Sequence, residues 1–198
     1  LKFDENGDFT ILHLTDWHTV YPMPEIHKQY AKEALAHPEL FQIAGVVDVR
    51  PERVELAKRT FDIPEENCFS SVEEMVKRPK FADAVINGTM DQQHVETSIP
   101  VLRAGYDLLL EKPFAVDQEE ADRLLACAHE TGRKVMICHV LRYSTFYRRI
   151  KEKLLEGALG DIINIQMSEH VSYHHLSTSY VRGKWANSDI CKTSMLLA

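Results

Sequence analysis

The 198-residue sequence lacks several features, and each absence removes a class of protein. No apolar run approaches the roughly 20 residues that span a bilayer, and residues 1–8 lack the charged-then-apolar pattern of a secretory signal. Lys and Arg number 23 against 30 Asp and Glu, and this net charge of -7 argues against a nucleic-acid or anionic-membrane surface. We therefore expect a cytoplasmic protein that binds small molecules.

The cysteines show no Cys-x-x-Cys spacing. They are Cys68, Cys127, Cys138 and Cys191, and each lies inside an apolar or helical pattern. This placement favours reduced, buried thiols over a zinc site or a disulfide framework.

Short apolar runs alternate with helical patterns along most of the chain. The runs contain few polar residues, as expected for strands covered on both faces of a parallel sheet. They lie at 9–14, 43–47, 84–86, 107–110 and 135–138, with helices expected at 30–36, 51–60, 71–77, 94–104 and 118–131. Ser70 or Ser71 and Asp117 are expected as helix N-caps, and Gly105 and Gly132 as helix stops. The pattern predicts an α/β fold with a Rossmann-like doubly wound parallel sheet.

The character of the sequence changes beyond about Arg142. An amphipathic helix is expected at 146–155, followed by period-two alternation at 162–168 that is typical of a strand. We predict a Rossmann-like domain over 1–140, a fold that typically binds dinucleotides, and the start of an α+β domain over 141–198.

Polar residues follow three of the expected strands, at the edge where a doubly wound sheet binds ligands. Asp48 ends the second strand, where a carboxylate can accept hydrogen bonds from ribose or cap the next helix. After the third strand a Gly88-containing turn leads to His94, which is either a ligand contact or a first-turn helix residue. The fourth strand ends in Glu111-Lys112-Pro113, so Lys112 either points an ammonium into the cleft or pairs with Glu111 at the surface.

Together, these segments resemble the Gfo/Idh/MocA family of NAD(P)-dependent sugar and polyol oxidoreductases. The Glu111-Lys112-Pro113 motif is the most specific part of the resemblance, which runs from about Tyr30 to the end. The other segments are Val46-Val47-Asp48, Thr89 to His94, Ala104-Gly105, His139 to Tyr143 and Gly157 to Asp161. The resemblance implies a Rossmann domain followed by an open, mostly antiparallel sheet that lines the substrate pocket and forms oligomers.

The resemblance also implies roles for individual residues. Asp48 would hold the adenosine ribose of NAD or NADP, with Thr89, His94 and Glu111 along the cofactor. Lys112 would be the catalytic lysine beside nicotinamide. Arg142, Tyr143 and His175 would face a carbohydrate or polyol substrate, and a complete second domain would form a homo-oligomer. Asp48 favours NAD because a carboxylate repels the 2′-phosphate of NADP, and the neighbouring Arg50 and Arg53 weaken this preference.

Two features depart from the family pattern. After Leu14 no glycine occurs before Gly45, and residues 15–24 contain Asp16 and two prolines where the family has a Gly-rich turn for the pyrophosphate. The sequence also stops at Ala198, before the family's segment with a second catalytic group, a histidine. We therefore expect a truncated chain with weakened cofactor binding and little activity of its own.

Two other functions compete with hydride transfer. Residues 7–18 resemble the opening of calcineurin-like metallophosphoesterases, in which an Asp-x-His pair such as Asp16 and His18 binds metal. One such pair is not a site, because a catalytic metal usually needs three protein ligands. The second alternative is a Rossmann-like scaffold without dinucleotide, which the missing glycines favour and which Asp48 and Lys112 oppose.

Overall fold

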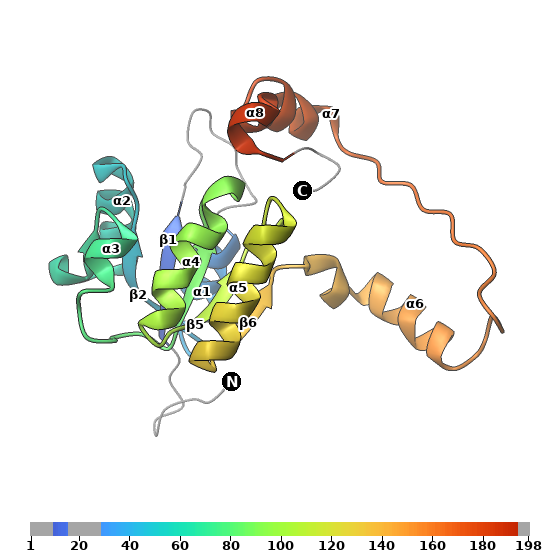
Figure 1. The fold of residues 1–198 in the computed structure, drawn as a ribbon, viewed down its shortest axis with the longest axis horizontal. Helices are drawn as coiled ribbons and strands as arrows, with labels where there is room; N and C mark the ends of the chain where they lie inside the picture. Colours follow the sequence, from blue (N-terminus) through green and yellow to red (C-terminus); the bar gives the residue numbers. More distant parts are fainter. Residues whose placement is uncertain (1–9, 16–28, 194–198) are drawn as a thin grey trace. The chain divides into compact units, whose positions relative to one another are not determined.

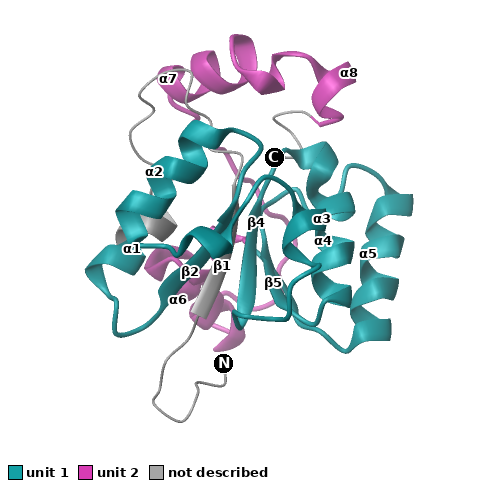
Figure 2. Ribbon diagram, turned by 90° about the vertical axis from the view of Figure 1, so that its left-hand side faces the viewer, with its two compact units in different colours: residues 1–137 teal, residues 138–198 magenta. Residues whose placement is uncertain are grey.

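The computed structural model describes residues 10–15 and 29–193. The chain forms two compact units, Leu1–Ile137 and Cys138–Ala198 (Figure 2). The division falls three residues before the domain boundary expected after residue 140.

The first unit contains a six-stranded sheet in which neighbouring strands run parallel, in the order β3-β2-β1-β4-β5-β6. Its strands are β1 (Thr10–Thr15), β2 (Gln42–Val47), β3 (Cys68–Phe69), β4 (Ala84–Gly88), β5 (Asp107–Leu110) and β6 (Val135–Ile137). The order reverses at β1, as in a dinucleotide-binding fold. The predicted α/β doubly wound sheet is confirmed, although the sequence pattern missed the two-residue β3.

Helices cover both faces of this sheet. The helices are α1 (Gln29–Ala36), α2 (Pro51–Phe61), α3 (Val72–Met75), α4 (His94–Arg103) and α5 (Gln118–Thr131), with 3-10 turns η1 (Glu65–Asn67) and η2 (Asp91–Gln93). The first two helices lie on one face, and α3, α4 and α5 lie on the other (Figures 1 and 2).

The predicted helix signals act as expected. The Ser71 side chain accepts a hydrogen bond from the Glu74 N–H, and the Asp117 carboxylate accepts one from the Glu120 N–H. Hydrogen bonds from Ser70 hold the pKa of Glu74 below its ordinary value. Gly132 ends α5 in the left-handed conformation, with φ of 64°, which glycine adopts without a steric cost.

Strand β2 contributes apolar side chains to both faces of the sheet, and the core is in two layers. Val46 packs in the cluster that contains residues of α1 and α2, and the next residue, Val47, packs in the cluster of α3, α4 and α5. This explains why β2 is apolar throughout. Tyr106 is fully buried in the larger cluster, and burial raises the pKa of its hydroxyl.

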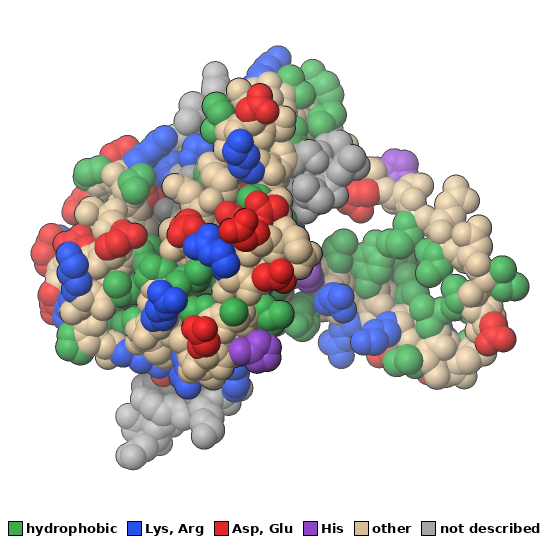
Figure 3. Space-filling view, in the orientation of Figure 1, with side chains coloured by type: hydrophobic (Ala, Val, Ile, Leu, Met, Phe, Trp, Pro, Cys, Tyr) green, Lys and Arg blue, Asp and Glu red, His purple; other side chains and the backbone are tan. Residues whose placement is uncertain are grey.

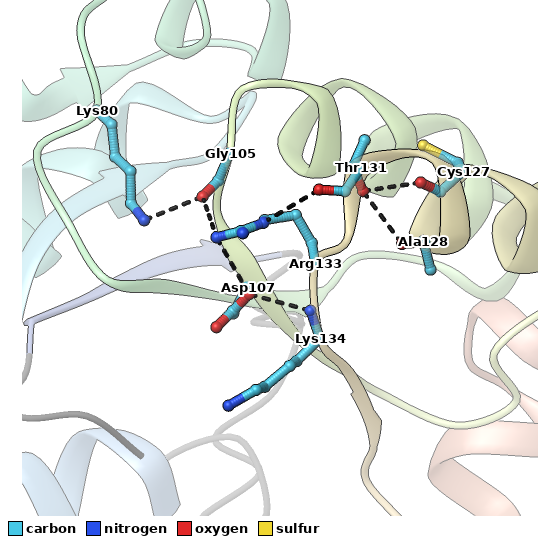
Figure 4. A network of polar contacts seen from close by, with 8 residues as sticks. All are labelled: Lys80, Gly105, Asp107, Cys127, Ala128, Thr131, Arg133 and Lys134. Atoms are coloured by element: carbon cyan, nitrogen blue, oxygen red, sulfur yellow. Dashed lines mark hydrogen bonds and ion pairs between the residues drawn. The ribbon is translucent and has the colours of Figure 1, made fainter.

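Polar contacts fix the amino ends of β5 and β6, opposite to the edge where ligands are expected (Figure 4). The Asp107 carboxylate accepts a hydrogen bond of 3.0 Å from the Lys134 N–H and lies 3.9 Å from the Arg133 guanidinium. Lys80 donates to the Gly105 carbonyl at 3.0 Å. These contacts connect the end of α4 to the start of both strands.

The second unit contains α6 (Thr145–Leu155) and a group of short helices. These are η3 (Val140–Tyr143), α7 (Tyr173–His175), the π-helix η4 (Leu176–Val181), η5 (Lys184–Ala186) and α8 (Ser188–Cys191). The prediction of a strand at 162–168 is wrong, since this segment has no regular structure. Within the described part of this unit it has no partner strand, and Ile163 is 97% exposed. An isolated strand leaves its backbone groups unpaired, so alternation alone does not form one.

Charged side chains of both signs lie on the viewed face of the first unit. Acidic and basic side chains are interspersed over the helices that face the viewer in Figure 3, without a large area of one sign. In the described ranges, no helix is long and apolar enough to cross a membrane. All four cysteines are free, and three of them are buried.

We predict that Leu102→Ala lowers the free energy of unfolding by about 2–5 kcal/mol, because the fully buried side chain leaves a cavity. Urea titration followed by circular dichroism measures the change. Leu125→Ala is the control, since Leu125 is 57% exposed on α5 and its loss should cost about 0.5 kcal/mol or less. Equal losses for both variants would contradict the assignment of the core.

Candidate functional site

The register of the sheet brings the candidate residues to one edge. Val47 and Asn87 both pair with Leu14, Asn87 pairs with Leu110, and Leu110 pairs with Ile137. These residues form a row across the sheet near the carboxyl ends of its strands. Asp48 comes one residue after this row on β2, and Lys112 comes two residues after it on β5. The two residues therefore leave the same edge.

Asp48 is 3% exposed, and both of its carboxylate oxygens have partners. Oδ1 accepts a hydrogen bond of 2.9 Å from the Arg50 N–H, and Oδ2 lies 3.4 Å from Nη1 of the buried Arg53. The residue at the N-cap position of α2 is Arg50, which makes no side-chain cap. The carboxylate thus orders the turn between β2 and α2 while its charge is offset by an arginine.

Asn87 is a fully buried polar residue in β4 that organises the following turn. Its Oδ1 accepts from the N–H of Thr89 at 3.1 Å and from its hydroxyl at 2.8 Å. Its Nδ2 donates to the hydroxyls of Thr97 and Ser98, at 2.8 and 2.9 Å, and to the His94 carbonyl at 3.3 Å. The β4 end, the turn and the first turns of α4 are therefore one connected frame.

His94 is 1% exposed at the start of α4, and both of its ring nitrogens contact backbone carbonyls. Nδ1 lies 2.7 Å from the Pro113 oxygen, and Nε2 lies 2.9 Å from the Thr89 oxygen. The imidazole is thus held between two segments of this unit, so both ring nitrogens are engaged within the protein.

The Glu111-Lys112-Pro113 segment continues directly from β5. The Glu111 N–H donates to the Asn87 carbonyl at 2.9 Å, and the Lys112 N–H donates to the Glu111 carboxylate at 3.3 Å. The Lys112 side chain is exposed, and the Lys112–Pro113 peptide is cis. This arrangement presents an ammonium at the carboxyl edge on an anchored backbone.

The remaining predicted site residues belong to the second unit. Arg142 and Tyr143 are exposed residues of η3. The ring of His175 in α7 makes an edge contact with Tyr180, with centroids 5.8 Å apart, and Tyr180 in turn lies 6.2 Å from Trp185. Aromatic rings and polar groups therefore gather in one part of this unit.

A metal site has no support in the described ranges, where no group of three His, Cys, Asp or Glu side chains lies close enough to hold an ion. Asp16 and His18 lie outside the described residues. The glycine-free stretch over 16–28 lies outside them as well.

Sequence reasoning missed the organising role of Asn87 and the pairing of Arg53 with Asp48. Asn87 had a usable signal, because a polar residue inside an apolar strand must find partners when it is buried. Arg53 had none, since an arginine in the first turns of a charged helix is usually solvated. Its pairing with Asp48 depends on the tertiary fold.

The sequence was compared with known families and proteins. The model of an oxidoreductase family with an NAD-binding Rossmann fold, GFO_IDH_MocA, matches residues 24–139. The chain is 35% identical over 91 residues to 1,5-anhydro-D-fructose reductase of Ensifer adhaerens, covering 46% of the chain and 27% of the relative. It is 29% identical to scyllo-inositol 2-dehydrogenase (NADP(+)) IolW of Bacillus subtilis, covering 79% of the chain and 40% of the relative. The chain thus spans less than half the length of these relatives.

Solved structures share the fold. Scyllo-inositol dehydrogenase from Lactobacillus casei, with bound NAD(H) and scyllo-inositol, has a TM-score of 0.67 at 20% identity, covering 78% of this chain and 43% of that one. The WlbA dehydrogenase from Bordetella pertussis, in complex with NADH and UDP-GlcNAcA, has a TM-score of 0.67 at 21% identity, covering 78% and 45%. Both confirm the Rossmann-like architecture.

We predict that Asn87→Ala lowers the free energy of unfolding by about 2–4 kcal/mol, because it leaves several buried polar groups without partners. Chemical denaturation measures the loss. Gln93→Ala removes an exposed side chain from the same turn and should have little effect. If the two variants were equally stable, the turn would not depend on Asn87.

Proposed function

The chain belongs to the Gfo/Idh/MocA family of oxidoreductases, and we propose that it serves hydride transfer between a nicotinamide cofactor and a sugar-like or polyol substrate. The cofactor of this family is NAD or NADP. The substrate class is supported by relatives named as inositol dehydrogenases and an anhydrofructose reductase.

One observation carries the proposal. The register row aligns the ends of β2, β4 and β5, and Asp48, Thr89 and Lys112 follow these ends. In an open parallel sheet this edge, beside the strand where the order reverses, is the ligand site. A carboxylate near one end of the row and an ammonium on the other side of β1 fit the ribose and nicotinamide ends of a dinucleotide.

Each residue has a proposed role. Asp48 would accept hydrogen bonds from the adenosine ribose, while Thr89, His94 and Glu111 would border the cofactor. Bound nicotinamide would supply the hydride chemistry. The Lys112 side chain would act in two protonation states. As an ammonium it would donate a hydrogen bond to the reacting substrate oxygen, and as a neutral amine it would take the proton of the substrate hydroxyl.

Three residues of the second unit are proposed as substrate-binding residues in their own right. They are Arg142, Tyr143 and His175, since arginine and histidine can hydrogen-bond to hydroxyl groups and aromatic rings offer an apolar face to a sugar. The contact of His175 with Tyr180 supports a ring surface of this kind.

The first test is titration of the 198-residue chain with NADH and NADPH, followed by cofactor fluorescence. We expect Asp48→Asn to weaken NADH binding about tenfold, the loss that corresponds to one charge-assisted hydrogen bond. The same change should narrow the difference in affinity between NADH and NADPH, because the 2′-phosphate of NADPH no longer lies near a carboxylate.

Glu52→Gln is a matched control, since it removes an exposed carboxylate from the first turn of α2. Its NADH affinity should equal that of the original chain. The melting temperature of each variant shows whether a loss of affinity is a loss of folding, because Asp48→Asn also alters the buried contact with Arg53.

The scaffold function is the second candidate, and the glycine-free sequence between Leu14 and Gly45 favours it. A pyrophosphate needs close approach to a glycine backbone and free N–H donors. If neither cofactor binds at millimolar concentration, the scaffold function stands and hydride transfer by this chain is rejected. Phosphodiesterase turnover with manganese that is abolished by His18→Ala would instead favour the metal-dependent alternative.

A further inference from the structure

His94 joins two segments that are far apart in the sequence. Its buried ring lies between the Thr89 carbonyl, in the turn after β4, and the Pro113 carbonyl, directly after Lys112. The contact with Pro113 is the shorter, at 2.7 Å.

The chemistry of the two oxygens determines what the ring must do. A carbonyl oxygen only accepts hydrogen bonds, so a ring nitrogen at this distance has to carry a proton. A neutral imidazole has one N–H and completes one contact, whereas a charged ring completes both. Because the contact with Pro113 is the shorter of the two, the stronger requirement is a proton on Nδ1, which faces Pro113.

The two segments that the His94 ring connects differ in how firmly they are held. On one side, Thr89 and the His94 carbonyl are both hydrogen-bonded to the buried Asn87. On the other side, Lys112 is exposed, and its segment is anchored by the Glu111 N–H bond to the Asn87 carbonyl. The His94 contact adds an anchor after Lys112 to the one before it.

We propose that His94 is the positioning residue of Lys112, holding the backbone on the carboxyl side of the lysine against the frame around Asn87. The functional meaning of this role rests on the proposed hydride transfer, in which the ammonium must meet one substrate oxygen. Pre-set placement of such a group contributes to catalysis because little reorganisation remains for the reaction. His94 acts through backbone contacts, and Lys112 is the group that reaches the substrate.

The protonation of the ring is measured by nitrogen NMR of the chain labelled with ¹⁵N-histidine, and His94→Gln assigns the signal. A proton on Nδ1, alone or together with one on Nε2, is the expected result. A ring protonated only on Nε2 would place a lone pair against the Pro113 oxygen and overturn the proposal. This measurement uses the unmodified chain and does not depend on a variant that folds.

The positioning role is tested by hydrogen exchange with mass spectrometry. In His94→Leu, which has no donor, the segment 111–116 should exchange about three- to tenfold faster, as expected when one hydrogen bond is lost. Exchange in β2 and α2 should stay unchanged. His94→Gln can still donate to Pro113 and should restore part of the protection, and His129→Gln, an exposed histidine on α5, should change nothing.

If His94 served overall stability alone, the result would differ: hydrogen exchange in β2, α2 and 111–116 would become faster by the same factor. That outcome would reject the positioning role, as would unchanged exchange of 111–116 in a folded His94→Leu chain. The NADH titration of the original chain is independent of both measurements. A failure to bind cofactor would reject the proposed function, but it would not affect the measured contact of His94 with Pro113.

Discussion

The parallel pairing of β1 with both β2 and β4 is the constraint on which the rest of the structure depends. Leu14 pairs with Val47 on one side and with Asn87 on the other, so the two halves of the sheet share one register. Parallel strands must return through a crossover, and the crossovers here place helices on opposite faces. All loops that follow the strands consequently leave from one edge. Asp48 and Lys112 are far apart in the sequence, but this arrangement brings both to the same edge of the sheet.

Most of this arrangement could be predicted from the sequence because its signals are local. Apolar runs such as 43–47 and 107–110 identify buried strands, and Asp117 and Gly132 mark the ends of a helix with their own chemistry. The fold class follows from the alternation of these signals. The two-residue β3 could not be predicted, since it has no period and forms only because β2 offers a free edge.

The failure at 162–168 has the opposite cause. The alternation in this segment is clear, but a strand is a paired structure, and local sequence does not provide the pair. The polar contacts of the site were unpredictable for a related reason. Arg53 finds its partner across the turn between β2 and α2, and His94 contacts Pro113, which is 19 residues away. The sequence indicated that polar residues lie at this edge, but it did not indicate which of them contact one another.

These contacts divide the edge into a rigid part and an accessible part. Asp48, Asn87 and His94 are buried and hydrogen-bonded, so their positions are set before any ligand arrives. Lys112 has the complementary character, with an exposed side chain on a backbone that is tied to the buried frame. A buried network of this kind is costly if any member lacks a partner, and it holds a single geometry when all members are satisfied. The frame therefore favours precise placement of a mobile, charged side chain.

The glycine-free sequence after β1 changes how such an edge can hold a dinucleotide. A Gly-rich turn supplies N–H donors to the pyrophosphate, at the centre of the cofactor, whereas this sequence contains Asp16 and two prolines. The centre of the ligand then gains less from the protein than its two ends. In the proposed function, recognition of the dinucleotide would depend on the carboxylate after β2 and on the lysine after β5, which lie on opposite sides of β1 in the sheet order. Binding of this kind would favour discrimination between cofactors over high affinity, because contacts with the common phosphates are the part that is reduced.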